Sequence, residues 1–111
     1  MNIQIFGRAR CFDTKKAERY FKERRISYQF VDLARHGMSR GELVSVRNAV
    51  GGLPPLIDES REDAALLRYL AYDDDRLEKL VAQPELIQTP VVRNGRQATV
   101  GYHPDVWKTW A

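Results

Sequence analysis

The N-terminal part of the chain predicts a strand, a helix and a second strand in direct succession, and this order constrains the fold more than any other feature. Residues 2–6 and residues 26–31 alternate between apolar and polar side chains, as half-buried strands do. Between them, residues 13–25 predict an amphipathic helix with its apolar positions at Ala17, Tyr20 and Phe21. A helical crossover joins parallel strands, so we expect these two strands to lie parallel in one sheet.

The C-terminal part predicts a hairpin and a short helix. Residues 89–93 and 97–100 are predicted to be strands, with Asn94-Gly95 as a two-residue turn between them. The two strands should therefore pair antiparallel. Pro104 then occupies an early position of a final helix, on which we expect three side chains to face inward, namely Val106, Trp107 and Trp110.

The middle of the chain, from about residue 38 to residue 88, is predicted to be a helical insertion. Ser39 and Glu42 have the spacing of a capping box, and Gly51-Gly52 ends the helix that follows. Two further helices are predicted, a buried one from Ala64 to Tyr72 and a short one capped by Asp75 with Glu78. The resulting fold class is α/β, with the order β-α-β, helical insertion, β-β-α.

Length and composition indicate a single globular domain, residues 1–111, with 43% hydrophobic and 30% charged residues. No apolar stretch approaches the ~20 residues of a membrane span, so no membrane partner is expected. The first residues lack the basic and apolar regions of a signal peptide. Together with the presence of only one cysteine, this makes a reducing cytoplasm the expected location.

The net charge of +3 is unevenly distributed, because residues 1–25 carry eight basic and three acidic side chains. Such a surplus suits an anionic small molecule, a thiolate or a nucleic acid. No recognition-helix motif, aromatic stacking platform or zinc spacing accompanies it, so we expect no nucleic acid partner. The run Asp73-Asp74-Asp75 is expected to be a solvated turn and cap rather than a metal site.

Cys11 is the predicted catalytic residue. It lies between the first predicted strand and the first helix, where free backbone N–H groups and the helix dipole favour a thiolate. Arg8, Arg10 and Lys15 are close in sequence and act in the same direction. A lone cysteine can instead be a small buried core residue, but this electropositive position favours a reactive thiol. Thr14 is placed to donate a hydrogen bond to the sulfur, or is an ordinary residue of the first helical turn.

Several segments resemble the glutaredoxin-like arsenate reductase (ArsC-like) family, which has a thioredoxin fold and also contains Spx-type transcriptional regulators. The segment from Gly7 to Ala17 resembles the active-site segment of that family, and the strand from Ser27 to Leu33 follows the first helix directly. The insertion closes with Pro84-Glu85-Leu86, and Thr89-Pro90-Val91-Val92 leads through the hairpin to Val100-Gly101-Tyr102. The resemblance covers nearly the whole chain and implies a thioredoxin-like fold with a helical insertion.

The resemblance also implies roles for individual residues. Cys11 would be the nucleophile and would form a mixed disulfide or an oxyanion adduct. Pro90 would be a cis-proline that faces the cysteine, with the backbone of Thr89 available to pair with a bound thiol compound. The predicted substrate-binding residues are Arg8, Arg10, Thr14, Lys15, Thr89, Pro90 and Arg93.

Two positions depart from the pattern of the arsenate reductases in this family. Thr89 stands where those enzymes usually carry an arginine, and the insertion near residues 53–56 lacks the arginine expected there. Arg93 lies on the same strand face as Thr89, but four strand residues span ~13 Å, which is too far for a direct replacement. A tetrahedral oxyanion needs several fixed donors, ideally guanidinium forks, so we expect arsenate reduction to be weak.

The expected function is that of a cytoplasmic, single-cysteine thiol oxidoreductase of the ArsC-like family. Because the chain has no second cysteine, an outside thiol must resolve oxidised Cys11, and glutathione or glutaredoxin is the expected co-substrate. No bound cofactor or metal is expected. The alternative is a non-enzymatic regulator that binds RNA polymerase or another protein, as the likeness to Spx-type regulators implies.

Overall fold

A four-stranded sheet in the order β2-β1-β3-β4 forms the centre of the computed structural model, which describes residues 1–110. The central strand β1 (Ile3–Gly7) pairs in parallel with β2 (Tyr28–Asp32) and antiparallel with β3 (Val91–Asn94). At the other edge, β4 (Gln97–Val100) pairs antiparallel with β3. The predicted parallel pair, the hairpin and the thioredoxin-like arrangement are thus confirmed.

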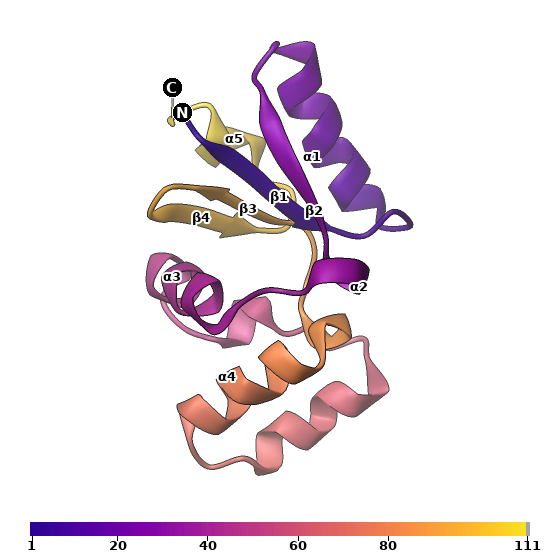
Figure 1. Ribbon diagram of the computed structural model, residues 1–111, viewed down its shortest axis with the longest axis vertical. Coiled ribbons are helices and arrows are strands. Elements are labelled where there is room, and N and C mark those ends of the chain that lie inside the picture. The colour runs from indigo at the N-terminus through magenta and orange to yellow at the C-terminus, as the bar shows by residue number, and fades with distance from the viewer. Residues whose placement is uncertain (111) are drawn as a thin grey trace.

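One face of the sheet is covered by α1 (Phe12–Glu23) and the short α5 (Pro104–Trp107), as Figure 1 shows. The alternation of β1 directs Ile3 and Ile5 to this face, where they meet the apolar side of α1. The whole buried cluster consists of Ile3, Ile5, Ala17, Tyr20, Phe21, Val92, Trp107 and Trp110. The indole Nε1 of Trp107 donates to Thr99 Oγ1 at 2.7 Å, which fixes α5 against β4.

The opposite face carries α2 (Leu33–His36), α3 (Arg40–Val50) and the rest of the insertion. The predicted capping box at the start of α3 is present, and the helix ends at Gly51 in the left-handed conformation, with φ of +85°. Three 3-10 helices and one α-helix complete the insertion, namely η1 (Pro54–Leu56), η2 (Glu62–Tyr69), α4 (Asp73–Ala82) and η3 (Pro84–Leu86).

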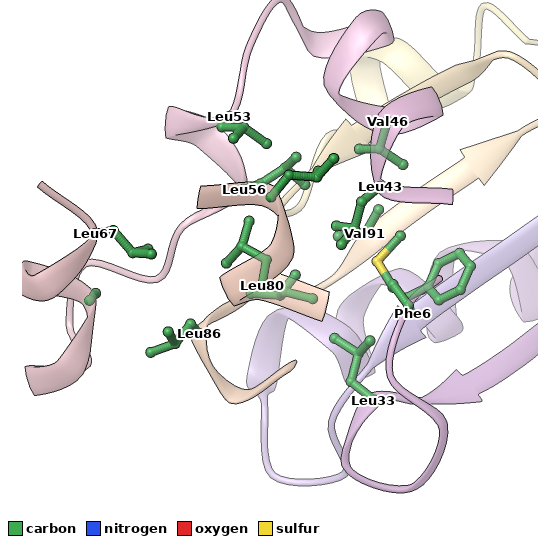
Figure 2. Close-up of a cluster of buried hydrophobic side chains, with 14 residues drawn as sticks. Phe6, Leu33, Leu43, Val46, Leu53, Leu56, Leu67, Leu80, Leu86 and Val91 are labelled. Carbon is green, nitrogen blue, oxygen red and sulfur yellow. The ribbon is translucent and has the colours of Figure 1, made fainter. Parts of the chain in front are cut away.

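A second buried cluster joins the sheet to the insertion (Figure 2). Phe6 and Val91 supply it from the sheet, while Leu43, Leu80 and Leu86 supply it from α3, α4 and η3. In Figure 1 the insertion extends away from the sheet along the longest axis of the molecule, whose extents are 43 × 26 × 22 Å. No helix among residues 1–110 is long and apolar enough to span a membrane.

Four local predictions are wrong. The hairpin turn consists of Gly95 and Arg96, because Asn94 still pairs with Gln97 in the ladder. The segment predicted as a helix from Ala64 to Tyr72 is the 3-10 helix η2, and its residues Leu66 and Tyr69 are exposed. The helix α4 begins at Asp73 rather than after a cap at Asp75. Val106 was predicted to face inward, but it is 41% exposed.

Candidate functional site

Cys11 occupies the N-cap position of α1 with an extended backbone, φ −87° and ψ 119°. Its backbone N–H donates to the carbonyl of Arg8 at 3.1 Å, so the loop after β1 turns back on itself before the helix begins. The thiol is partly exposed. The sulfur therefore faces both solvent and the free N–H groups of the first helical turn, which favour its anionic form.

The segment that leads into β3 lies beside this thiol. The Thr89–Pro90 peptide bond is cis, and the sulfur of Cys11 lies 3.8 Å from the carbonyl oxygen of Thr89. Both Thr89 and Pro90 are buried. In the protonated state, the thiol can donate to this carbonyl, while the thiolate can accept from the nearby hydroxyl groups.

Thr14 is buried at the start of α1, and its Oγ1 accepts the backbone N–H of Arg8 at 3.4 Å. Because this oxygen already accepts a hydrogen bond, its own proton is free to point at the sulfur of Cys11. A Cβ at residue 7 would lie 2.7 Å from the same oxygen. Gly7 is therefore needed for the close approach of β1 to Thr14.

Arg8 is fixed by main-chain carbonyls of the insertion rather than left free for a substrate. Its Nη1 donates to the carbonyl of Ile87 at 2.9 Å, and its Nη2 donates to that of Pro84 at 2.6 Å. A longer contact of 3.5 Å joins Nη1 to Thr89 Oγ1. Burial and the nearby Arg61 lower the pKa of Arg8 from its ordinary value. The guanidinium thus ties the Cys11 loop to the end of the insertion.

A cavity of about 350 Å³ opens beside Cys11. It combines charges of both signs, with guanidinium groups from Arg8, Arg10 and Arg61 and carboxylates from Asp13 and Asp58. The remaining lining residues are Cys11, Phe12, Ser60, Gln88 and Thr89. Before Cys11 ionises, the formal charge of this lining is +1, and a thiolate makes it neutral. The cavity therefore suits a ligand that carries both positive and negative groups.

Four of the predicted substrate-binding residues do not line this cavity, namely Thr14, Lys15, Pro90 and Arg93. The ammonium of Lys15 lies 5.9 Å from the centre of the exposed Phe12 ring. Arg93 donates to Gln4 Oε1 at 3.1 Å and to Ser45 Oγ at 3.5 Å, so its guanidinium joins β1 and α3 instead. Thr14 and Pro90 are buried, so they can affect Cys11 only from the protein side of the site and not by contact with a ligand in the cavity.

The structure adds Asp58, Ser60, Arg61 and Gln88, which the sequence did not indicate as site residues. An isolated β-bridge between Ile57 and Ile87 brings this loop of the insertion to the segment that precedes Thr89. Asp58 Oδ1 then accepts the backbone N–H of Ser60, and Arg61 Nε lies 3.7 Å from Asp58 Oδ2. Residues 53–56 lack an arginine, but the insertion brings Arg61 to the cavity from a few residues further along the chain.

The pKa of Cys11 is set by opposing effects. Burial raises the pKa of the thiol, whereas hydrogen bonds from the hydroxyls of Thr14 and Thr89 and from the N–H groups of Thr14 and Asp13 lower it. The pKa is lowered overall from its ordinary value. The donors thus outweigh partial burial, as expected for a thiol at a helix N-terminus.

We predict that the alkylation rate of Cys11 by iodoacetamide has its pH inflection below the ~8.5 of a free thiol. Thr14→Val should move the inflection upward, because valine has nearly the same shape but no donor hydroxyl. Thr14→Ser keeps the hydroxyl and should stay near the wild type. A wild-type inflection at or above the free-thiol value would contradict this account of the site.

Comparisons with known proteins agree with this architecture. A model of the ArsC family matches residues 6–110. The global transcriptional regulator Spx 2 of Oceanobacillus iheyensis is 30% identical over 110 residues, which is 95% of this chain and 80% of that protein. An ArsC-family-related protein from Bacteroides fragilis superposes with a TM-score of 0.88 at 18% identity, over 100% of this chain and 98% of that one. The arsenate reductase from Vibrio cholerae superposes with a TM-score of 0.84 at 20% identity, over 96% of this chain and 94% of that one.

The fold and the position of Cys11 define a thioredoxin-like protein with one cysteine at the start of its first helix. The chain belongs to the ArsC family, since the family match covers nearly its whole length.

Proposed function

We propose that this protein is a single-cysteine thiol oxidoreductase that uses glutathione, directly or through a glutaredoxin. The observation that carries the proposal is the partly exposed Cys11 with a lowered pKa, beside a cavity whose lining carries both guanidinium and carboxylate groups. A thiolate is the form that attacks a disulfide sulfur. The site supplies the nucleophile and no second thiol, so the resolving thiol comes from outside.

The proposed cycle has two exchange steps. The Cys11 thiolate attacks one sulfur of a disulfide, forms a mixed disulfide and releases the other half as a thiolate. An external glutathione thiolate then attacks the mixed disulfide and restores Cys11. Where the bound disulfide joins a substrate thiol to glutathione, attack on the glutathionyl sulfur releases the substrate as a thiolate, and the second step consumes one external glutathione and releases glutathione disulfide.

Glutathione matches the charges of the cavity. It carries two carboxylates and one ammonium group, and the cavity offers Arg10 and Arg61 to the former and Asp13 and Asp58 to the latter. Hydrogen bonds between guanidinium and carboxylate groups are stronger than hydrogen bonds between neutral groups. The backbone of Thr89, next to the sulfur, offers polar main-chain groups to the peptide part of the ligand.

We predict that incubation with glutathione disulfide adds one glutathionyl group to the wild-type protein and none to Cys11→Ser, as measured by intact-protein mass spectrometry. Arg61→Gln should slow this addition, because it removes a guanidinium that can bind a carboxylate of glutathione. The Arg61 side chain is exposed, so its replacement should leave the core intact. Arg68→Gln, also exposed and in the insertion, is the matched control. No adduct on the wild type would contradict the proposal.

A second candidate function is that of a regulator that binds RNA polymerase or another protein without turnover. It is favoured by the 30% identity to a protein described as a global transcriptional regulator. The two candidates differ in their need for the thiol. A regulator's partner binding should survive Cys11→Ser, whereas disulfide reduction should be lost in that variant.

A further inference from the structure

The solvent side of α1 carries a basic surface that the thiol chemistry does not use. Between Phe12 and Arg25, the exposed charged residues are six cations and one carboxylate. The cations are Lys15, Lys16, Arg19, Lys22, Arg24 and Arg25, and the carboxylate is Glu23. The sequence shows only a diffuse surplus of charge in this region, whereas the structure exposes these side chains along α1 and the turn that follows it.

Three of these cations form a stripe along the helix. Lys15, Arg19 and Lys22 follow one another at spacings of four and three residues, which places them on the same side of α1. Among residues 1–110, none of the three has a carboxylate within 4.0 Å. From residue 15 to residue 22 the helix rises roughly 10 Å, so the stripe is too extended for a single small anion.

The two other carboxylates of α1 have partners outside the stripe. Glu18 is partly buried and accepts from the phenol of Tyr28 at 3.3 Å. Asp13 is partly buried and lies 3.8 Å from Lys16 at the end of the helix that faces the Cys11 cavity. The negative charges of the sequence therefore cancel little of the stripe's positive charge.

A hollow of about 340 Å³ lies beside the stripe, between α1 and the start of α5. Lys16, Arg19 and Arg24 line it together with Tyr20, Tyr102, Pro104 and one carboxylate, that of Glu23. The ammonium of Lys16 lies 5.7 Å from the centre of the Tyr102 ring, which is 40% exposed. The hollow thus offers three cations and a partly exposed aromatic face within reach of one another.

From this arrangement we infer that the outer face of α1, together with the hollow, binds the phosphate backbone of a nucleic acid. A protein partner would need an apolar centre in its interface, and Phe12 is the one exposed apolar side chain between residues 12 and 25. Interfaces with nucleic acids are instead polar and strongly positive. From the sequence we expect no nucleic acid partner, because no recognition-helix motif, aromatic stacking platform or zinc spacing accompanies the charge. The contact of Lys16 with the ring of Tyr102 is visible only in the structure.

The test is fluorescence anisotropy of a labelled mixed-sequence DNA duplex titrated with the reduced full-length protein at several salt concentrations. The three cations of the stripe should contribute about −3 to the slope of log K against log salt concentration. The variant Lys15→Gln/Arg19→Gln/Lys22→Gln should bind at least about tenfold more weakly at low salt, with a slope less steep than that of the wild type by about 3.

The control variant Arg35→Gln/Arg68→Gln/Arg96→Gln removes the same charge from three exposed positions outside α1 and should bind like the wild type. Cys11→Ser should also bind normally, because the surface acts independently of the thiol. Three results would overturn the inference: no binding of the duplex at low salt, an equal loss in the control variant, or displacement of the duplex by polyglutamate at the same charge concentration.

Discussion

Arg8→Ala is expected to destabilise the protein by about 2–4 kcal/mol in a guanidinium chloride unfolding experiment, because two charge-assisted hydrogen bonds are lost together. The side chain donates to the carbonyls of Pro84 and Ile87 at 2.6 and 2.9 Å, and Ile87 is fully buried. Removing the donor leaves these carbonyls without their partner in a partly buried place. The decrease in the free energy of unfolding should exceed that caused by an ordinary surface substitution, which is within about 0.5 kcal/mol.

Arg10→Ala provides the matched control, because Arg10 is exposed and lines the same cavity. Its unfolding free energy should stay near that of the wild type. Arg8→Lys should be intermediate, since an ammonium cannot reach both carbonyls with the planar fork of a guanidinium. Equal stability of Arg8→Ala and the wild type would mean that the insertion is held in place by its apolar cluster alone.

The same change should slow the reaction of Cys11. The backbone of Arg8 accepts from the N–H of Cys11 and donates to Thr14 Oγ1, so the loop that Arg8 holds also holds the thiol and its hydroxyl donor. Arg8 does not touch a reacting atom in this account and is a positioning residue. This interpretation replaces the expectation from the sequence that its charge binds the substrate.

The order of the main elements could be predicted because each one has a clear local pattern. β1 and β2 alternate, α1 repeats its apolar residues at helical spacing, and Ser39 with Glu42 marks the start of α3. A crossover between two strands then leaves a parallel pair as the natural arrangement. These patterns depend on neighbouring residues alone, and the sequence contains them in full.

The errors arose where tertiary packing decides between local alternatives. The dipeptide Asn94-Gly95 is a strong turn signal, yet register against β1 keeps Asn94 in the strand and moves the turn to Gly95 and Arg96. The apolar run from Ala64 to Tyr72 suggested a buried helix. In η2, only Ala64 and Leu67 reach the core, because a 3-10 helix repeats every three residues.

The site shows the same division. The position of Cys11 at the start of α1 could be expected from its place between a strand and a helix, whereas the placement of Thr89 and Pro90 beside it was implied by the resemblance to a family. Arg61 could not be recognised in either way, because the β-bridge between Ile57 and Ile87 brings it to the cavity from a distant part of the sequence. The sequence signal nearest to it is the turn formed by Asp58 and Ser60.

Weak arsenate reduction is the second expected result, and the structure supplies a reason beyond the missing arginine at Thr89. Arsenate is a tetrahedral anion with negative charge on all its sides, whereas Asp13 and Asp58 place carboxylates in the cavity beside Cys11. Arg8 is already bonded to carbonyls, and Arg61 lies against Asp58. Few free guanidinium donors are therefore left to hold an oxyanion.

Asp58→Asn is expected to raise arsenate turnover on the order of tenfold, because it removes the repulsion between the Asp58 carboxylate and the arsenate anion. Two unit charges 4 Å apart interact by about 1 kcal/mol in water and by about 4 kcal/mol near a protein surface. The amide oxygen can still accept from the N–H of Ser60, so the turn is kept. The assay follows NADPH oxidation with glutathione, glutaredoxin and glutathione reductase. Asp63→Asn, an exposed carboxylate outside the cavity, is the control and should leave turnover unchanged.

Robust wild-type turnover would show that Arg10 and Arg61 suffice to hold the oxyanion despite the two carboxylates. If Asp58→Asn raises arsenate turnover without raising the rate of Cys11 glutathionylation, Asp58 discriminates between the two ligands by their charge. Glutathione has an ammonium group that Asp58 can bind, and arsenate has none. The carboxylate that repels one ligand would then help to select the other.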